Sequence, residues 1–148
     1  MNEKEIAKII IEAFKRGNKL LVCGNGGSAS MSQHMAAELV CKYKYDRKAL
    51  PAIALTTDTS IITAWANDFS FGGIFNRQVE ALGKEGDVLL TLSTSGNSAN
   101  VLSAMMLAEA KKLKVISLPC KGKDTPEIQE NHLKMIHKIC EIVEKAFL

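Results

Sequence analysis

The same arrangement occurs twice in this chain: an apolar run of strand length, a turn rich in glycine and hydroxyl groups, and then a helical pattern. The first copy is residues 20–23 followed by GNGGS at 24–28, and the second is residues 88–92 followed by STSGNS at 93–98. Glycine lets a backbone turn tightly against a ligand, and the free N–H groups at a helix start favour an anion. The two turns therefore indicate a phosphate site or, alternatively, two ordinary strand-to-helix turns. Ser28 is the expected N-cap of the first of these helices.

Neither turn has the P-loop pattern or the complete dinucleotide-binding pattern. Strand patterns at 20–23, 52–55, 88–92 and 115–118 alternate with helical patterns, including an N-terminal helix at about 3–16. This alternation predicts an α/β fold in which residues 1–148 form a single domain, a three-layer sandwich with a parallel sheet flanked by helices. Ligands of such sheets bind beyond the carboxyl ends of the strands, so we expect both turns at one site.

Composition excludes several classes of function. A net charge of +3 with 5% aromatic residues offers neither the charge nor the stacking surface of a nucleic-acid binder. No apolar run approaches the roughly 18 residues of a membrane span, and the N-terminus lacks a signal-peptide layout, so we expect a cytoplasmic protein with no membrane partner. The four cysteines have no CxxC spacing, and Cys23 and Cys140 are expected to be core residues without disulfides.

The last segment, about 125–147, has the pattern of one long helix. Leu133, Ile136, Cys140, Val143 and Phe147 form one apolar stripe, and residues 135, 139 and 142 form a second, partly overlapping face. A helix that is apolar over so much of its circumference is either deeply buried or packed against another subunit. We therefore expect an oligomer.

Two helices carry side chains capable of chemistry. His34 and Glu38 are four residues apart and share a helix face, while Gln129, His132 and His137 lie on the last helix. Imidazole and carboxylate groups together suit a divalent metal such as zinc, or a general acid/base pair. The alternatives are a surface ion pair and ordinary histidines of the core or surface. Gln129 and His137 are separated by about 12 Å of helix rise, so one metal reaches both only with extended side chains or ligands from two subunits.

Three further polar residues follow the second predicted strand. Asp58, Asn67 and Asp68 could point at the same opening as the two turns, or serve as an N-cap and a loop turn.

Taken together, these residues resemble the phosphoheptose isomerases of the sugar isomerase (SIS) domain superfamily. The motifs that carry the resemblance are CGNGGS at 23–28, HMAAEL at 34–39, PAIA at 51–54, NDF at 67–69, EGDVLL at 85–90, STSGNSANV at 93–101 and IQENHLKMIH at 128–137. They occur in the family's order and span almost the whole chain. The resemblance implies a SIS-domain, flavodoxin-like fold.

The resemblance also implies an aldose–ketose isomerase that converts sedoheptulose 7-phosphate to D-glycero-D-manno-heptose 7-phosphate through an enediol, towards the heptose of lipopolysaccharide. It implies a homotetramer with sites at subunit interfaces and one zinc per subunit. Glu38 and His137 match the catalytic positions. The metal-ligand positions are His34, Glu38, Gln129 and His137. The substrate-binding positions are Asn25, Gly26, Gly27, Ser28, Asp58, Asn67, Asp68, Ser93, Thr94, Ser95, Ser98 and Gln129.

The alternative is a non-catalytic SIS module that binds sugar phosphates or a replication initiator; the presence of both Glu38 and His137 favours the enzyme. Two features depart from the family. A strand usually present between the strand at 115–118 and the last helix is missing, so either a sheet strand has been lost, which would expose a sheet edge, or the sequence omits a stretch. Pro126 also stands where some members have an aspartate that assists catalysis.

Overall fold

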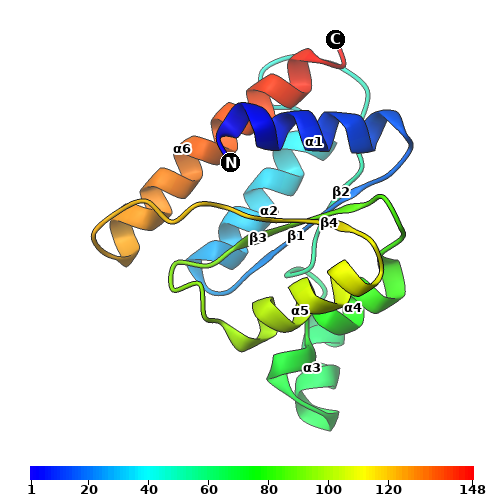
Figure 1. Ribbon diagram of the computed structural model, residues 1–148, viewed down its shortest axis with the longest axis vertical. Coiled ribbons are helices and arrows are strands. Elements are labelled where there is room, and N and C mark those ends of the chain that lie inside the picture. The colour runs from blue at the N-terminus through cyan, green and yellow to red at the C-terminus, as the bar shows by residue number, and fades with distance from the viewer.

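Four parallel strands form the central sheet of the computed structural model, which describes residues 1–148 (Figure 1). In chain order they are β1 (Leu20–Gly24), β2 (Ala52–Ala54), β3 (Val88–Leu92) and β4 (Lys114–Ser117). Their order across the sheet is β2-β1-β3-β4, with every neighbouring pair parallel. All residues of β1 and β3 are buried, which explains why both read as continuous apolar runs.

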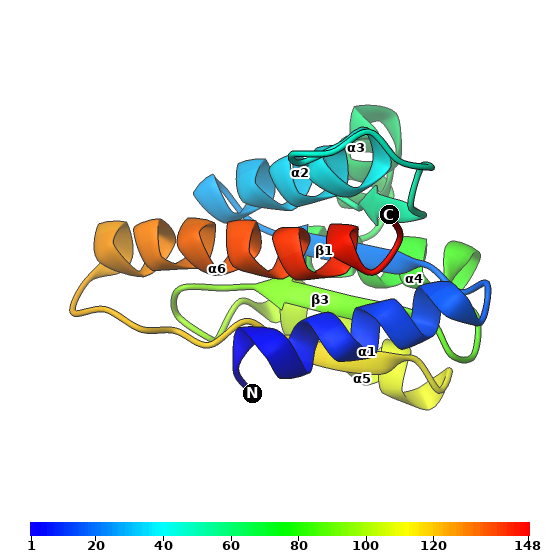
Figure 2. The same cartoon turned by 90° about the horizontal axis from the view of Figure 1, so that it is seen from above.

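Helices cover both faces of the sheet (Figures 1 and 2). One face carries α1 (Glu3–Lys15), α2 (Gly27–Val40) and α6 (Thr125–Lys145). The other carries α4 (Asn76–Leu82) and α5 (Ala99–Ala110), with α3 (Thr59–Asp68) and the 3₁₀ turn η1 (Phe71–Gly73) packed beside them. Alternate residues of β1 enter the two cores, Leu20 and Val22 on the first face and Leu21 and Cys23 on the second. The predicted three-layer α/β sandwich is thus confirmed.

The start of α2 differs from the expectation. The helix begins at Gly27 and its N-cap is Gly26, with φ +58°, so Ser28 lies inside the first turn and the prediction that it caps the helix was wrong. A positive φ suits glycine, and that conformation turns the chain from β1 directly into α2. The cap predicted for α3 is correct, because the Asp58 side chain accepts the N–H of Ile61 at 3.1 Å.

The buried face of α6 packs against α1 and α2 (Figure 2). Its buried side chains include Ile136, Ile139 and Val143, whereas Leu133, which the apolar stripe included, is 36% exposed. All four cysteines are free, and Cys23 and Cys140 are buried as expected; burial raises the pKa of the Cys23 thiol to about 12. None of the helices is long and apolar enough to cross a membrane.

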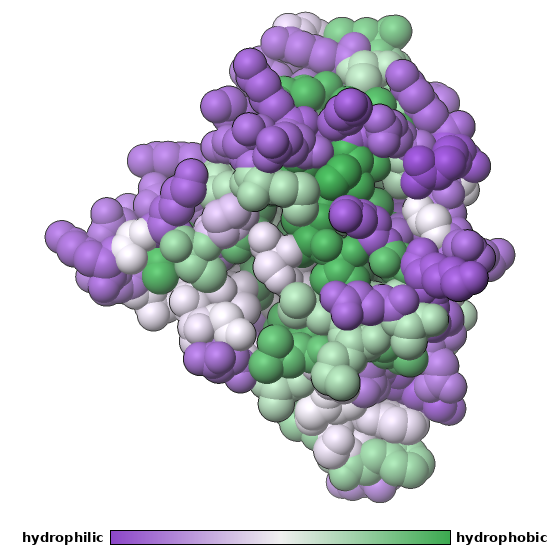
Figure 3. All heavy atoms as spheres, in the orientation of Figure 1, coloured by the Kyte–Doolittle hydropathy of each residue, from purple (hydrophilic) through white to green (hydrophobic).

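β4 is an open edge of the sheet. Residues 118–124 lead from β4 to α6 without another strand, as the short sequence there predicts. Figure 3 shows apolar atoms gathered over the middle of the face that carries β4. Lys114 is exposed at the start of this strand, and a charged residue on an edge strand opposes pairing with another chain.

Asp87 fixes the two segments that precede β1 and β3. Its carboxylate accepts the backbone N–H of Lys19 at 3.0 Å, the Lys19 ammonium at 2.6 Å, the Asn18 amide at 3.0 Å and the N–H of Lys84 at 2.8 Å. Burial by itself would raise the pKa of Asp87, but the hydrogen bonds from Lys19, Asn18 and Lys84 outweigh it and hold the pKa below its usual value. The carboxylate therefore remains ionised in the folded protein.

We expect Asp87→Asn to lower the free energy of unfolding at pH 7 by about 2–4 kcal/mol, because it removes a buried charge with four donors. Since the folded pKa is depressed, this stabilisation is complete above the unfolded pKa of about 3.9 and disappears as the pH falls through the folded value. Urea denaturation at pH 7 and pH 3 measures both effects. The exposed Asp46→Asn is the control, expected to change stability by less than about 0.5 kcal/mol; equal losses in the two variants would contradict the assignment.

Candidate active site

The turns after β1 and β3 lie side by side at the carboxyl edge of the sheet. These strands are neighbours, and their last residues, Gly24 and Leu92, are paired. A reciprocal hydrogen bond joins the turn after β1 to the start of α5: Asn25 and Asn100 each donate Nδ2 to the other's Oδ1 at 2.9 Å. The expected convergence of the two turns is therefore confirmed.

The turn after β1 needs glycine for close packing. A Cβ on Gly24 would lie 2.7 Å from the backbone oxygen of Leu92 and 2.7 Å from the Cβ of Ser28. The missing side chain thus allows α2 to begin directly against β1 and β3. Ser28, a predicted substrate contact, is consequently almost fully buried in this turn.

The turn after β3 gathers donors at the start of α5. Ser93 Oγ lies 3.4 Å from Ser98 Oγ and accepts the N–H of Gly96 at 3.1 Å. Ser95 Oγ accepts the N–H of Asn97 at 3.1 Å, and the half-buried Thr94 lies between these serines in the chain. Gly96 has φ +71°, which makes the tight turn possible. Hydroxyl and N–H groups at a helix start form a suitable cradle for an anion such as phosphate.

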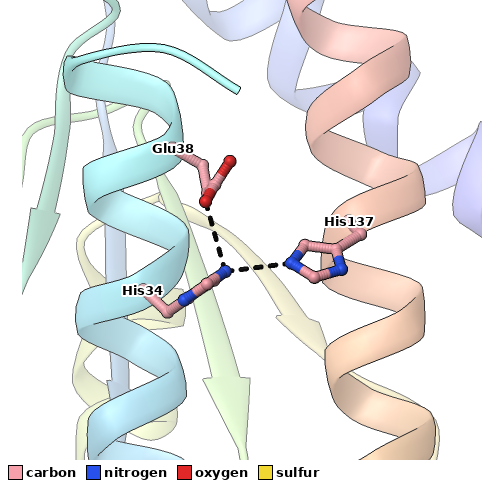
Figure 4. A group of neighbouring side chains, drawn as sticks. All are labelled: His34, Glu38 and His137. Carbon is pink, nitrogen blue, oxygen red and sulfur yellow. Dashed lines mark hydrogen bonds and ion pairs between the residues drawn. The ribbon is translucent and has the colours of Figure 1, made fainter. Parts of the chain in front are cut away.

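A second cluster lies between α2 and α6. His34 Nε2 is 3.2 Å from Glu38 Oε1 and 3.0 Å from His137 Nε2, and ligand atoms of all three residues lie within 4.8 Å of one another (Figure 4). His34 and Glu38 occupy successive turns of α2, and His137 faces them from α6. The structure thus joins two side chains that are 103 positions apart in the sequence.

These three side chains form a group that can hold a metal ion. Two nitrogens bound to zinc at about 2.0–2.1 Å lie about 2.8–3.4 Å apart for angles between 90° and tetrahedral, and the two Nε2 atoms here are 3.0 Å apart. Two imidazoles and a carboxylate are also typical ligands of catalytic zinc. Gln129, the fourth predicted ligand, does not join them in this chain, because its side chain lies against Gly27 at the start of α2.

A groove of about 340 Å³ runs along the amino-terminal halves of α2 and α6. It is lined by Gly27, Ser30, Met31, Pro126, Gln129, Glu130 and Leu133. Ser30 and Leu133 are each one helical turn before His34 and His137, so the inner end of the groove adjoins the cluster. Gln129 therefore lines the groove that adjoins the cluster.

The predicted residues of α3 lie elsewhere. Asp58 is used as the N-cap, and the Asn67 amide donates to Asp68 at 3.1 Å on the exposed end of the helix. α3 packs on the α5 side of the sheet, across from α2 and α6 (Figure 1). The structure does not bring these three residues to the cluster of His34, Glu38 and His137.

His132 is a core residue. Its ring is fully buried, Nε2 lies 3.1 Å from the Pro119 carbonyl oxygen, and Nδ1 has no partner. Burial lowers the pKa of His132, outweighing the hydrogen bonds of the 118–119 segment, so the imidazole is neutral at pH 7. His132 is therefore an ordinary histidine of the core, one of the alternatives that the sequence left open.

Two residues of the site were not singled out from sequence. Asn100 is buried and hydrogen-bonded to Asn25. The only feature of the sequence that indicates it is its position as a polar residue in the first turn of the helix after STSGNS. The ring of Tyr43 stacks on His137, with centroids 5.5 Å apart and planes at 27°. Nothing in the polar connection around Tyr43 indicates this contact.

A doubly wound sheet with an anion cradle at its carboxyl edge defines a class of small-ligand-binding α/β domains. Within that class, the family model described as "SIS domain" matches residues 2–119. The phosphoheptose isomerases of Pelobacter propionicus and Clostridium acetobutylicum are both 49% identical to this chain. Each alignment covers 96% of this chain, together with 84% of the Pelobacter protein and 81% of the Clostridium protein. The first alignment runs over 158 positions, so that relative contains residues that this 148-residue chain lacks.

Solved structures of phosphoheptose isomerases have the same fold as this chain. A phosphoheptose isomerase from Francisella tularensis has a TM-score of 0.93 at 37% identity, and one from Neisseria gonorrhoeae has 0.89 at 38%; each match covers 97% of this chain and 85% of the other. The chain belongs to the SIS domain family and, within it, to the phosphoheptose isomerases, which are isomerase enzymes.

Replacing Asn100 tests the link between the two turns. Asn100→Ala leaves both amide atoms of Asn25 without partners, so we expect a loss of about 1–3 kcal/mol in the free energy of unfolding and faster amide exchange across residues 93–98. Urea denaturation and hydrogen exchange measure these effects. The exposed Asn97→Ala is the matched control, and identical exchange in the two variants would show that the pair does not hold the turn.

Proposed function

We propose that this chain converts sedoheptulose 7-phosphate to D-glycero-D-manno-heptose 7-phosphate through an enediol. The observation that carries the proposal is the meeting of Glu38 and His137 on facing helices, beside a groove that begins at the sheet edge. A carboxylate and an imidazole are the usual proton carriers of enzymes. A ketose–aldose exchange requires two proton movements, one at carbon and one at oxygen.

Glu38 removes a proton from C1 of the ketose and returns it to C2 of the enediol, giving the aldose. His137 moves the second proton between the sugar oxygens. Both side chains are partly exposed, so a substrate can reach them. General acid–base catalysis of this kind contributes about 10²–10⁴-fold to a rate.

The phosphate binds to the cradle formed by Ser93, Ser95 and Ser98, with Thr94 beside them. In the structure their hydroxyls interact with one another and with two backbone N–H groups, which supplies donors that a phosphate can take over. Binding of this remote group holds C1 and C2 against the proton carriers and thereby lowers the barrier. Asn25 and Gln129 contact the sugar between the two ends.

His34, Glu38 and His137 would hold a zinc ion, which would supply Lewis-acid polarisation of the sugar oxygens. The supporting observation is the geometry of the three donors, which suits one metal ion. Gln129 completes the ligand set only from a neighbouring subunit, since in its own protomer it rests on Gly27.

The protein acts as one SIS domain over residues 1–148 and assembles as a homotetramer with sites at its subunit interfaces. Supporting this assembly, α3 has no buried residue, and Phe69 and Phe71 beside it are 70% and 59% exposed. Large apolar side chains exposed together are typical of interaction surfaces. The cytoplasmic location and the absence of nucleic-acid partners stay predictions.

Incubation of the purified protein with sedoheptulose 7-phosphate in D₂O, followed by NMR, tests the reaction. We expect an aldose 7-phosphate with deuterium at C2, because an enediol exchanges its carbon-bound proton with solvent. A chelator is expected to abolish turnover, and added zinc to restore it. An oligomer that binds the sugar phosphate but yields neither product nor exchange would favour the non-catalytic module.

Replacing the base tests its role. Glu38→Gln keeps the shape of the side chain but cannot accept a proton, so we expect kcat to fall at least 100-fold, in line with the contribution of about 10²–10⁴ from general base catalysis. Glu109→Gln, an exposed change on α5, is the matched control and should retain wild-type turnover. Activity of Glu38→Gln within tenfold of the wild type would refute the assignment.

A further inference from the structure

The connection between α2 and β2, residues 41–51, passes the carboxyl end of α6 (Figure 1). Glu144, in the last turn of α6, holds it there. The Glu144 carboxylate is fully buried and accepts the N–H groups of Tyr43 at 3.0 Å and Lys44 at 2.8 Å. Arg47 Nε lies 3.3 Å from the same carboxylate.

This carboxylate is ionised. Burial would raise the pKa of Glu144, but the backbone N–H groups of residues 43–45 and the charge of Arg47 outweigh burial and lower it. A buried anion with several donors and a buried cation is costly to disrupt, because removing one partner leaves the other charge without compensation. The connection is therefore fixed to α6 rather than loosely attached.

Arg47 extends from this anchor to the end of α2 that carries Glu38. Its side chain is 1% exposed, and Nη2 donates to the Glu38 carbonyl oxygen at 2.7 Å while Nη1 donates to the Cys41 carbonyl oxygen at 3.1 Å. The last carbonyls of a helix have no partners within the helix, and a cation that binds them keeps the final turn from fraying. Arg47 thus holds the turn on which Glu38 stands.

Tyr43, on the same connection, contacts the other proton carrier. Its ring stacks on His137 with centroids 5.5 Å apart, and the His34 ring also contacts that imidazole, with centroids 5.1 Å apart. Two rings around His137 restrict its rotation. The connection between α2 and β2 therefore contacts both the turn of α2 that carries Glu38 and the ring of His137.

We propose that Arg47 and Tyr43, anchored by Glu144, are positioning residues that set the placement of Glu38 relative to His137. This inference rests on the proposed isomerase activity. Proton transfer requires the carriers to lie within hydrogen-bond reach of the sugar, and a displacement of about 1 Å can cost on the order of 10²-fold in rate. The effect is on kcat, because neither residue lies in the phosphate cradle.

The test compares four variants in the NMR assay with sedoheptulose 7-phosphate. Tyr43→Leu and Arg47→Gln are expected to lower kcat about 10- to 100-fold with KM within threefold of the wild type. Tyr43→Phe keeps the stacked ring and should restore kcat to within threefold. Tyr45→Leu is the matched control, because the Tyr45 side chain is 44% exposed on the same connection, and it should leave kcat unchanged.

Hydrogen exchange separates positioning from a general loss of structure. In Arg47→Gln the amides of the last turn of α2 should exchange faster, while those of β1 and β3 remain protected. A wild-type kcat in Tyr43→Leu would overturn the inference, and so would a rise in KM at unchanged kcat in either variant. Because Tyr43 is only half-buried, Tyr43→Leu gives a decisive answer even if Arg47→Gln unfolds. An inactive wild type would instead refute the proposed function.

Discussion

The parallel pairing of β1 with β3 is the constraint on which the site depends. The two strands are in register from Leu20 and Val88 to Gly24 and Leu92, so they end at the same level. Both following turns must then emerge together, and both following helices begin there. A slip of one residue would turn every buried side chain of a strand to the opposite face, and two apolar cores prevent it.

Local patterns in the sequence were sufficient for the fold. Near-continuous apolar runs identify β1 and β3, because a strand covered on both faces is apolar at almost every position. Asp58 was recognisable as an N-cap because a helix start imposes its own residue preference over a few positions. The anion cradle of residues 93–98 was visible for the same reason: its hydroxyls and glycine are contiguous.

The remaining features depend on contacts between distant segments. The Asn25–Asn100 pair joins residues 75 positions apart, and the buried Glu144 binds a connection about 100 positions away, so no local period reports either contact. The preference of serine for caps predicts Ser28 as the N-cap of α2, yet the cap is Gly26, two residues earlier. His34 with Glu38 was a recognisable pair, but only packing of α6 on α2 decides that His137 joins it and that Gln129 meets Gly27 instead.

The long separation of His34 from His137 also bears on the synthesis of the protein. At on the order of 10 residues per second, about ten seconds pass between translation of His34 and translation of His137. Throughout that interval the outer surface of α2 and part of the first core lack the cover that α6 provides. A nascent chain can therefore pair β1 with β3 and form the turns of residues 24–28 and 93–98 before His34, Glu38 and His137 can meet, and the arrival of α6 completes the core and the cluster in one step.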